Sequence, residues 1–259
     1  AQYLFWFKAR PGPSPGAAEW VEVRLMDLAN PGTEFVVERQ YNPPRPERTP
    51  VDLAVPRWMR GLPVFTYGFA DAAGDIQARE ATVAPGGGVT LRQVTDAPFN
   101  HFDPSPFFDG EARYLFPGRD GEPRVQVYRQ GPGETAYAPW RLIEVTESAM
   151  AQPCRAISNE PFVWDGAIVT SFHLSDCAQG GSFLSSTSEI WTAALGEGGT
   201  ETFLLAGEEG ATFNEPEFAR TDERAFIYFT RYPAGSNVFT VEYELYRVEV
   251  RAPASGVRD

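Results

Sequence analysis

The sequence predicts an all-β protein, and within that class a five-bladed β-propeller of four-stranded antiparallel blades. Three observations lead to this prediction. The 259 residues include 23 prolines and 24 glycines and are 14% aromatic, which is typical of many short strands joined by turns. No long stretch has the 3.6-residue periodicity of a helix. A phrase of about 50 residues recurs, and four-stranded units at roughly that period are the sequence signature of propeller blades.

The recurring phrase begins with an acidic residue followed by proline. These steps are Asp103-Pro104, Glu160-Pro161 and Glu215-Pro216, which are 57 and then 55 residues apart. Each step leads through aromatic residues into a turn and then into strands of aromatic and aliphatic residues. We therefore expect each unit to hold an inner strand near the acidic-proline step, two central strands and an outer strand.

The domain boundaries follow from this phrase. We expect a single β-propeller domain over residues 1–259, with an incomplete first blade and four further repeats, at 1–40, 50–96, 97–146, 150–206 and 211–251. The first blade lacks an inner strand. Because an unpaired strand edge invites aggregation, we expect the two termini to meet and residues 251–259 to help close the ring. A two-sheet sandwich is the alternative, but it does not explain the repeat.

The phrase resembles the repeat of TolB-like (WD40-like) β-propellers. The resemblance is carried by the acidic-Pro-x-aromatic pattern, the Asp-Gly turn, and third strands such as Glu189-Ile190-Trp191 and Glu244-Leu245-Tyr246. It covers residues 94–250 and departs at Thr221-Asp222-Glu223, where Asp-Gly is usual. The resemblance implies a binding or scaffold module that recognises a protein or a small polar ligand at the channel mouth, without a cofactor.

Charge and hydropathy narrow the partners. The net charge of −13 and the isoelectric point near 4.7 argue against nucleic acid or an anionic membrane as the main partner. No apolar run approaches the roughly 20 residues that span a bilayer, so we expect no membrane insertion. We separately expect the protein to be a monomer. The chain starts at Ala1-Gln2, as a mature protein would after removal of a signal peptide, which favours a periplasmic or secreted protein.

The two cysteines predict a disulfide. Cys154 lies in the connection that enters an inner strand, and Cys177 follows the next strand. Because successive strands of a blade are antiparallel, both cysteines fall on the same face of one blade. A bridge that closes about 23 residues stabilises a fold by roughly 3 kcal/mol in the chain-entropy model. Two separate thiols are the alternative.

Polar residues gather where the inner strands begin. The same antiparallel argument places these strand starts, and the loops after the second strands, around the channel mouth. The candidate ligand-binding residues there are Asn100, His101, Asp103, Glu160, His173 and Glu215. They could bind a cation such as Ca²⁺, a sugar or a basic peptide. In the structural alternative, the acidic residues accept backbone N–H bonds at blade junctions or pair with nearby arginines, and the histidines are ordinary loop residues.

A catalytic function is the alternative to binding. Five-bladed arabinanases and xylosidases place three carboxylates, one per inner strand, at the channel mouth, and Asp103, Glu160 and Glu215 resemble that set. Inverting glycoside hydrolysis needs an acid and a base about 6.5–9.5 Å apart. The sequence departs from those enzymes because the first motif lies in the third repeat and proline directly follows the third carboxylate. Both functions therefore stay open: an exported binding module, or a glycoside hydrolase.

Overall fold

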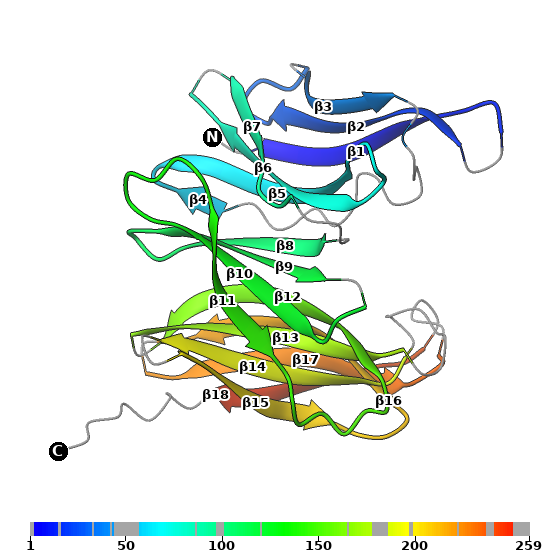
Figure 1. Cartoon of the computed structure of the whole chain (residues 1–259), viewed down its shortest axis with the longest axis vertical. Helices are drawn as coiled ribbons and strands as arrows, with labels where there is room; N and C mark the ends of the chain where they lie inside the picture. Colours follow the sequence, from blue (N-terminus) through cyan, green and yellow to red (C-terminus); the bar gives the residue numbers. More distant parts are fainter. Residues whose placement is uncertain are drawn as a thin grey trace. The chain divides into compact units, whose positions relative to one another are not determined.

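The computed structural model describes residues 3–14, 17–32, 34–41, 43, 57–85, 87–96, 101–119, 121–164, 166–177, 186–196, 199–221, 223–236 and 241–250, with the backbone only at 102, 103 and 157–160. These residues form eighteen strands, labelled in Figure 1. The strands are β1 (Tyr3–Pro11), β2 (Ala18–Asp27), β3 (Glu34–Tyr41), β4 (Arg57–Met59), β5 (Leu62–Ala70), β6 (Ile76–Val83), β7 (Val89–Gln93), β8 (His101–Phe108), β9 (Arg113–Arg119), β10 (Arg124–Gln130), β11 (Ala138–Glu144), β12 (Pro153–Trp164), β13 (Ala167–Asp176), β14 (Ser188–Gly196), β15 (Gly199–Gly207), β16 (Ala211–Arg220), β17 (Ala225–Pro233) and β18 (Glu244–Val250). Among the described residues, no helix is long and apolar enough to span a membrane.

The strands form five antiparallel sheets, each built from strands that follow one another in sequence. Their orders are β1-β2-β3, β4-β5-β6-β7, β11-β10-β9-β8, β12-β13-β14-β15 and β16-β17-β18. This is the strand arrangement of a five-bladed β-propeller, so the predicted fold class is confirmed. The three central sheets have the expected four strands. The first and fifth sheets have three each among the described residues, and only the first was expected to be incomplete.

The chain divides into two compact units, unit 1 (Ala1–Phe108) and unit 2 (Asp109–Asp259), and each is described by itself. The single-domain boundaries expected from the sequence stay a prediction. The expected ring closure falls on residues 251–259, which lie outside the described residues, so it also stays a prediction.

The core of unit 1 lies between its first two sheets. Val21, Val23 and Leu25 alternate along β2 and turn their side chains towards the aromatic residues Phe65 and Tyr67 of β5, and all five are buried. Alternation of this kind is what a strand with one covered face requires. Strand β5, by contrast, is buried at nearly every position, because both of its faces are covered.

One carboxylate is buried at the edge of this core. Glu22 of β2 has no exposed side-chain surface, and it accepts a hydrogen bond of 2.6 Å from Arg24 and another from Arg39. Burial alone would raise the pKa of Glu22, but the hydrogen bonds and charges of the two arginines outweigh it and hold that pKa below its usual range.

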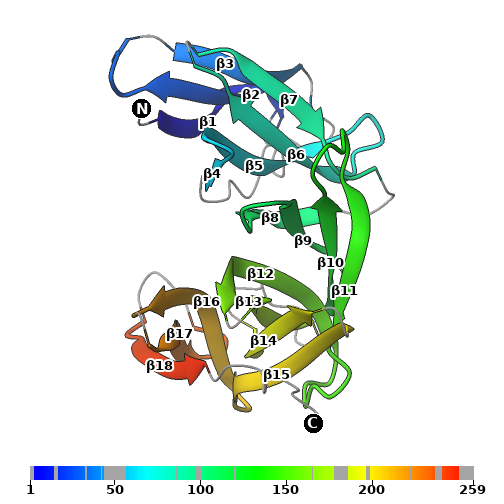
Figure 2. The ribbon, with the colours of Figure 1, turned by 90° about the vertical axis from the view of Figure 1, so that its left-hand side faces the viewer.

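The core of unit 2 lies where its last two sheets meet. Ile190, Phe213, Ile227, Phe229 and Val250 form a buried cluster contributed by β14, β16, β17 and β18. The views in Figures 1 and 2 agree in placing β16 beside β13 and β14. Strand β13 is buried on both faces over most of its length, which matches its run of apolar and small residues.

The recurring acidic-proline step marks a β-bulge. On β12, Glu160 and Pro161 together oppose the single residue Thr170 of β13, and on β16 Glu215 and Pro216 together oppose Phe229 of β17. Proline has no N–H to give to a ladder, so a bulge is one of the few places where a paired strand tolerates it. The repeat detected in the sequence is therefore in part a repeat of bulges.

The prolines of two such steps also join successive sheets. In unit 1, the hydroxyl of Thr66 on β5 donates a hydrogen bond to the carbonyl oxygen of Pro104 on β8. In unit 2, the hydroxyl of Ser171 on β13 donates to the carbonyl oxygen of Pro216 on β16, at 3.5 Å. In both units, the second strand of one sheet is thus bonded to the first strand of the next.

Candidate functional site

The predicted site residues of unit 1 fall on the start of β8. Asn100 lies outside the described residues, and Asp103 is on β8 with only its backbone described. His101, the first residue of β8, is 1% exposed, and its Nδ1 lies 3.4 Å from the carbonyl oxygen of Ile76 on β6. His101 therefore contacts the neighbouring sheet of its own unit, and its role as a ligand stays a prediction.

His173 is a buried residue in the middle sheet of unit 2. It lies on β13 opposite Ile157 of β12 and Ile190 of β14, and only 4% of its surface is exposed. Burial lowers the pKa of His173 to about 4, and the positive charge of Arg155 acts in the same direction. The imidazole is therefore neutral at pH 7, and any ligand role would use that neutral form.

Glu215 presents a carboxylate to solvent from an unusual backbone position. Its φ of 52° lies in the left-handed region, which costs a residue other than glycine roughly 1–2 kcal/mol. The side chain is exposed, whereas its neighbour Asn214 and the nearby Tyr232 are buried. Burial raises the pKa of Tyr232, and the negative charge of Glu215 raises it further. A hydrogen bond with Asn214 lowers this pKa but does not outweigh the other two effects. Glu215 thus borders an amide and a phenol.

Two of the predicted carboxylates occupy matching places in unit 2. Glu160 stands at the bulge of β12 and Glu215 at the bulge of β16, and both strands are the first of their sheets. The two strands pack against each other just beyond the bulges, where the rings of Phe162 and Phe218 stack with an angle of 11° between their planes. Unit 2 therefore places two of the three predicted residues at equivalent backbone positions on neighbouring strands.

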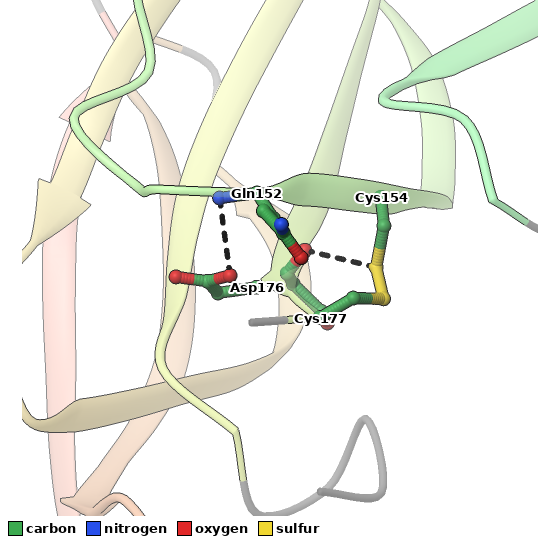
Figure 3. Close-up of a disulfide and its surroundings, with 5 residues drawn as sticks. Gln152, Cys154, Asp176 and Cys177 are labelled. Atoms are coloured by element: carbon green, nitrogen blue, oxygen red, sulfur yellow. Dashed lines mark hydrogen bonds between the residues drawn. A yellow bond between two sulfur atoms is a disulfide. The ribbon is translucent and has the colours of Figure 1, made fainter. Parts of the chain in front are cut away.

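The predicted disulfide is confirmed. Cys154 and Cys177 are bonded, with their Cα atoms 5.8 Å apart, and Figure 3 shows the bridge between the start of β12 and the end of β13. Beside it, the backbone N–H of Gln152 donates to Oδ1 of Asp176 at 3.2 Å, and the backbone N–H of Cys177 donates to the carbonyl oxygen of Gln152 at 3.0 Å. A structural disulfide indicates an oxidising compartment outside the cytoplasm.

A pocket next to this disulfide was not predicted from the sequence. It has a volume of about 480 Å³ and lies wholly within unit 2. Its lining combines four carboxylates with apolar and small residues, namely Ala149, Met150, Ala151, Asp176, Thr187, Glu189, Leu204, Gly207, Glu208 and Glu209. A signal was present: the carboxylates lie at the end of β13, the start of β14 and the end of β15, and antiparallel pairing brings these three points to one edge of the sheet.

The carboxylates at the floor of the pocket are held by hydrogen bonds. Glu189, only 3% exposed, accepts hydrogen bonds from the hydroxyl of Ser148 at 2.9 Å, the backbone N–H of Ala149 at 3.2 Å and Nε1 of Trp191 at 2.8 Å. Glu208 at the rim is exposed and pairs with Arg231 at 2.8 Å. The part of the chain that the structure describes holds no group of three or more His, Cys, Asp or Glu side chains arranged to bind a metal.

Comparisons with known proteins give a likeness of fold only. No protein-family model matches the sequence, and no curated protein matches it. Among solved structures, an endo-arabinase from Bacteroides thetaiotaomicron has a TM-score of 0.49 and 12% identity over 98% of this chain and 96% of its own. A thermostable family-43 glycoside hydrolase gives 0.49 and 12% over 92% and 86%, and a GH32 β-fructofuranosidase from Bombyx mori gives 0.45 and 11% over 91% and 53%. At these values we draw neither activity nor site residues from them.

Proposed function

We propose that this chain hydrolyses glycosidic bonds, with Glu160 and Glu215 as the paired carboxylates. The observation that carries the proposal is their placement at matching bulges on two adjacent first strands of unit 2. Bulges re-aim side chains and are frequent beside active sites. Glu215 also holds an exposed carboxylate on a strained backbone, and strain of this kind gathers at functional sites.

The chemistry needs two carboxyl groups in different roles. One protonates the leaving oxygen, and the other activates water or attacks the sugar. We assign the second role to Glu215, since it is exposed where water arrives, and the acid role to Glu160. Asp103 stands at the same step of β8 in unit 1, and its part in the reaction stays a prediction.

The test is hydrolysis measured on variants of single carboxylates. Release of reducing sugar from arabinan, xylan and a panel of aryl glycosides is compared for the wild type, E160Q and E215Q. Loss of either group is expected to lower the rate about 100-fold or more. The matched control is E217Q, which changes an exposed glutamate on the same strand just beyond the bulge. A wild type inactive on the whole panel, or activity kept by both variants, would sink the proposal.

A second candidate is the binding module that the TolB-like resemblance implies, and the acidic pocket favours it. A basic side chain of a protein ligand fits its chemistry, because Glu208 and Glu209 would meet the charge while Met150 and Leu204 cover the aliphatic stem. Calorimetry with a tetra-arginine peptide tests this. E208Q and E209Q should each weaken binding, whereas E201Q, on the exposed part of β15, should not. Binding that is absent in the wild type or equal in all variants would remove this candidate.

We also propose that the protein is exported to the periplasm or secreted. The disulfide supports this, because such bonds persist in oxidising compartments. Fractionation of the native host with an antibody against the protein tests it. Recovery of the protein in the cytoplasmic fraction with both thiols free would refute export.

A further inference from the structure

Strand β18 has an outer edge that no described strand covers. In the second, third and fourth sheets, the third strand is followed by a fourth, namely β7, β11 or β15. The fifth sheet ends at β18 among the described residues, and Figure 2 shows β18 at the edge of its sheet. The difference is visible in burial: β14, the third strand of the preceding sheet, is buried at most positions, while β18 is exposed at all but two of seven.

The two faces of β18 differ in chemistry. Tyr246, Val248 and Val250 share the face that packs on the sheet core, where Tyr246 stacks on Phe229 with an interplanar angle of 6°. On the opposite face, Arg247 lies over the ring of Phe226 at 4.7 Å. An exposed edge strand with an apolar face and no proline or lysine is a template for pairing with another strand.

We propose that a second copy of this chain occupies this edge, with the two β18 strands paired antiparallel about a two-fold axis at Val248. A two-fold axis perpendicular to the sheet keeps each side chain on its own face. A residue on one face of β18 can therefore lie opposite only a residue on the same face of the second copy. With the axis at Val248, this valine lies opposite the same valine of the second copy, and Tyr246 lies opposite Val250 of the second copy. On the other face, Arg247 faces Glu249 of the second copy.

Charge selects this register. Moving the axis to Arg247 sets two arginines opposite each other, and moving it to Glu249 sets two glutamates opposite each other, both of which are unfavourable. An axis at Tyr246 brings no pair of opposite charges together, because Leu245 then lies opposite Arg247 and Glu244 lies opposite Val248. Among the axes that pair described residues of β18 on both faces, only the axis at Val248 joins apolar pairs on one face with opposite charges on the other. This inference departs from the monomer expected from the sequence.

The experiment is a charge exchange across the two-fold axis. The wild type is expected to sediment at twice the 28.7 kDa monomer mass, in 0.15 M salt to screen the net charge of −13 on each copy. R247E and E249R each set like charges opposite, and each should raise the dimer dissociation constant about tenfold or more. An equimolar mixture of R247E and E249R restores opposite charges at both positions and should form the heterodimer.

Folding of each variant is checked by its thermal unfolding, and E201R, on β15 of another sheet, is the matched charge change that should leave the dimer intact. A monomeric wild type at 100 μM would overturn the proposal. Slow amide exchange in β18 of such a monomer would mean that a segment of the same chain covers the edge, and fast exchange would mean that the edge is open. Equal dimerisation of R247E, E249R and the wild type would overturn the register and the proposal with it.

Discussion

Acidification is expected to destabilise the protein through His173. The pKa of this histidine is about 4 in the folded state, because it is buried, and near 6.5 in an unfolded chain. Between these two values the unfolded state binds a proton that the folded state excludes. Stability is therefore unaffected above about pH 6.5 and falls as the pH drops from there towards 4.

The size of the effect follows from the two pKa values. At pH 5, the histidine is mostly protonated in the unfolded chain and mostly neutral in the fold, which costs about 2 kcal/mol of stability relative to pH 7.5. The cost grows to about 3 kcal/mol near pH 4, where carboxylates also begin to titrate. A measurement at pH 5 therefore separates the titration of this histidine from the titration of most carboxylates.

The assay is urea unfolding followed by tryptophan fluorescence at pH 7.5 and pH 5, for the wild type and for H173Q. Glutamine keeps a polar side chain of similar length but does not titrate. The wild type should lose about 2 kcal/mol more than H173Q between the two pH values. Equal losses in the two proteins, or a nuclear magnetic resonance titration of His173 near pH 6.5 in the folded state, would refute the reasoning.

Three further outcomes are expected. C177S removes the bridge to Cys154 and should lower the free energy of unfolding by roughly 3 kcal/mol, measured by urea unfolding, with the same loss for the wild type in reductant. E22Q leaves two arginines without their buried carboxylate and should cost about 3 kcal/mol, so an unchanged melting temperature would contradict the ion-pair assignment. E215G relieves the left-handed strain and should stabilise the fold by about 1 kcal/mol while abolishing hydrolysis; a loss of stability would show that the glutamate side chain supports the fold.

Much of the fold could be predicted because its signals are local. Turn residues, alternating apolar residues and the recurring acidic-proline step define five successive sheets without any knowledge of packing. The disulfide followed from the same information, since strand alternation alone puts Cys154 and Cys177 at one end of a hairpin. The reason for the acidic-proline step could not be predicted, because a bulge depends on the register with the neighbouring strand.

The site was harder to predict because the burial of a side chain depends on how neighbouring sheets pack, which the sequence does not show. His173 lies three residues from the end of β13, which suggested a place near the channel mouth, yet β13 is covered on both faces. The acidic pocket was missed for a related reason. Its residues come from three strand ends and from the connection at Ala149–Ala151. Glu189 belongs to the recurring third-strand pattern, but that pattern does not indicate a pocket. Only the paired strands show that they share one edge.

The hydroxyl-to-proline bonds have a consequence for synthesis of the chain. Thr66 finds its acceptor at Pro104, 38 residues downstream, and Ser171 finds its acceptor at Pro216, 45 residues downstream. At 5–20 residues per second, a ribosome supplies each acceptor roughly 2 to 9 s after the donor. During that interval the hydroxyl lacks the proline carbonyl that accepts its hydrogen bond in the fold. The second and the fourth sheets therefore each lack one of their hydrogen bonds until the first strand of the next sheet has been made.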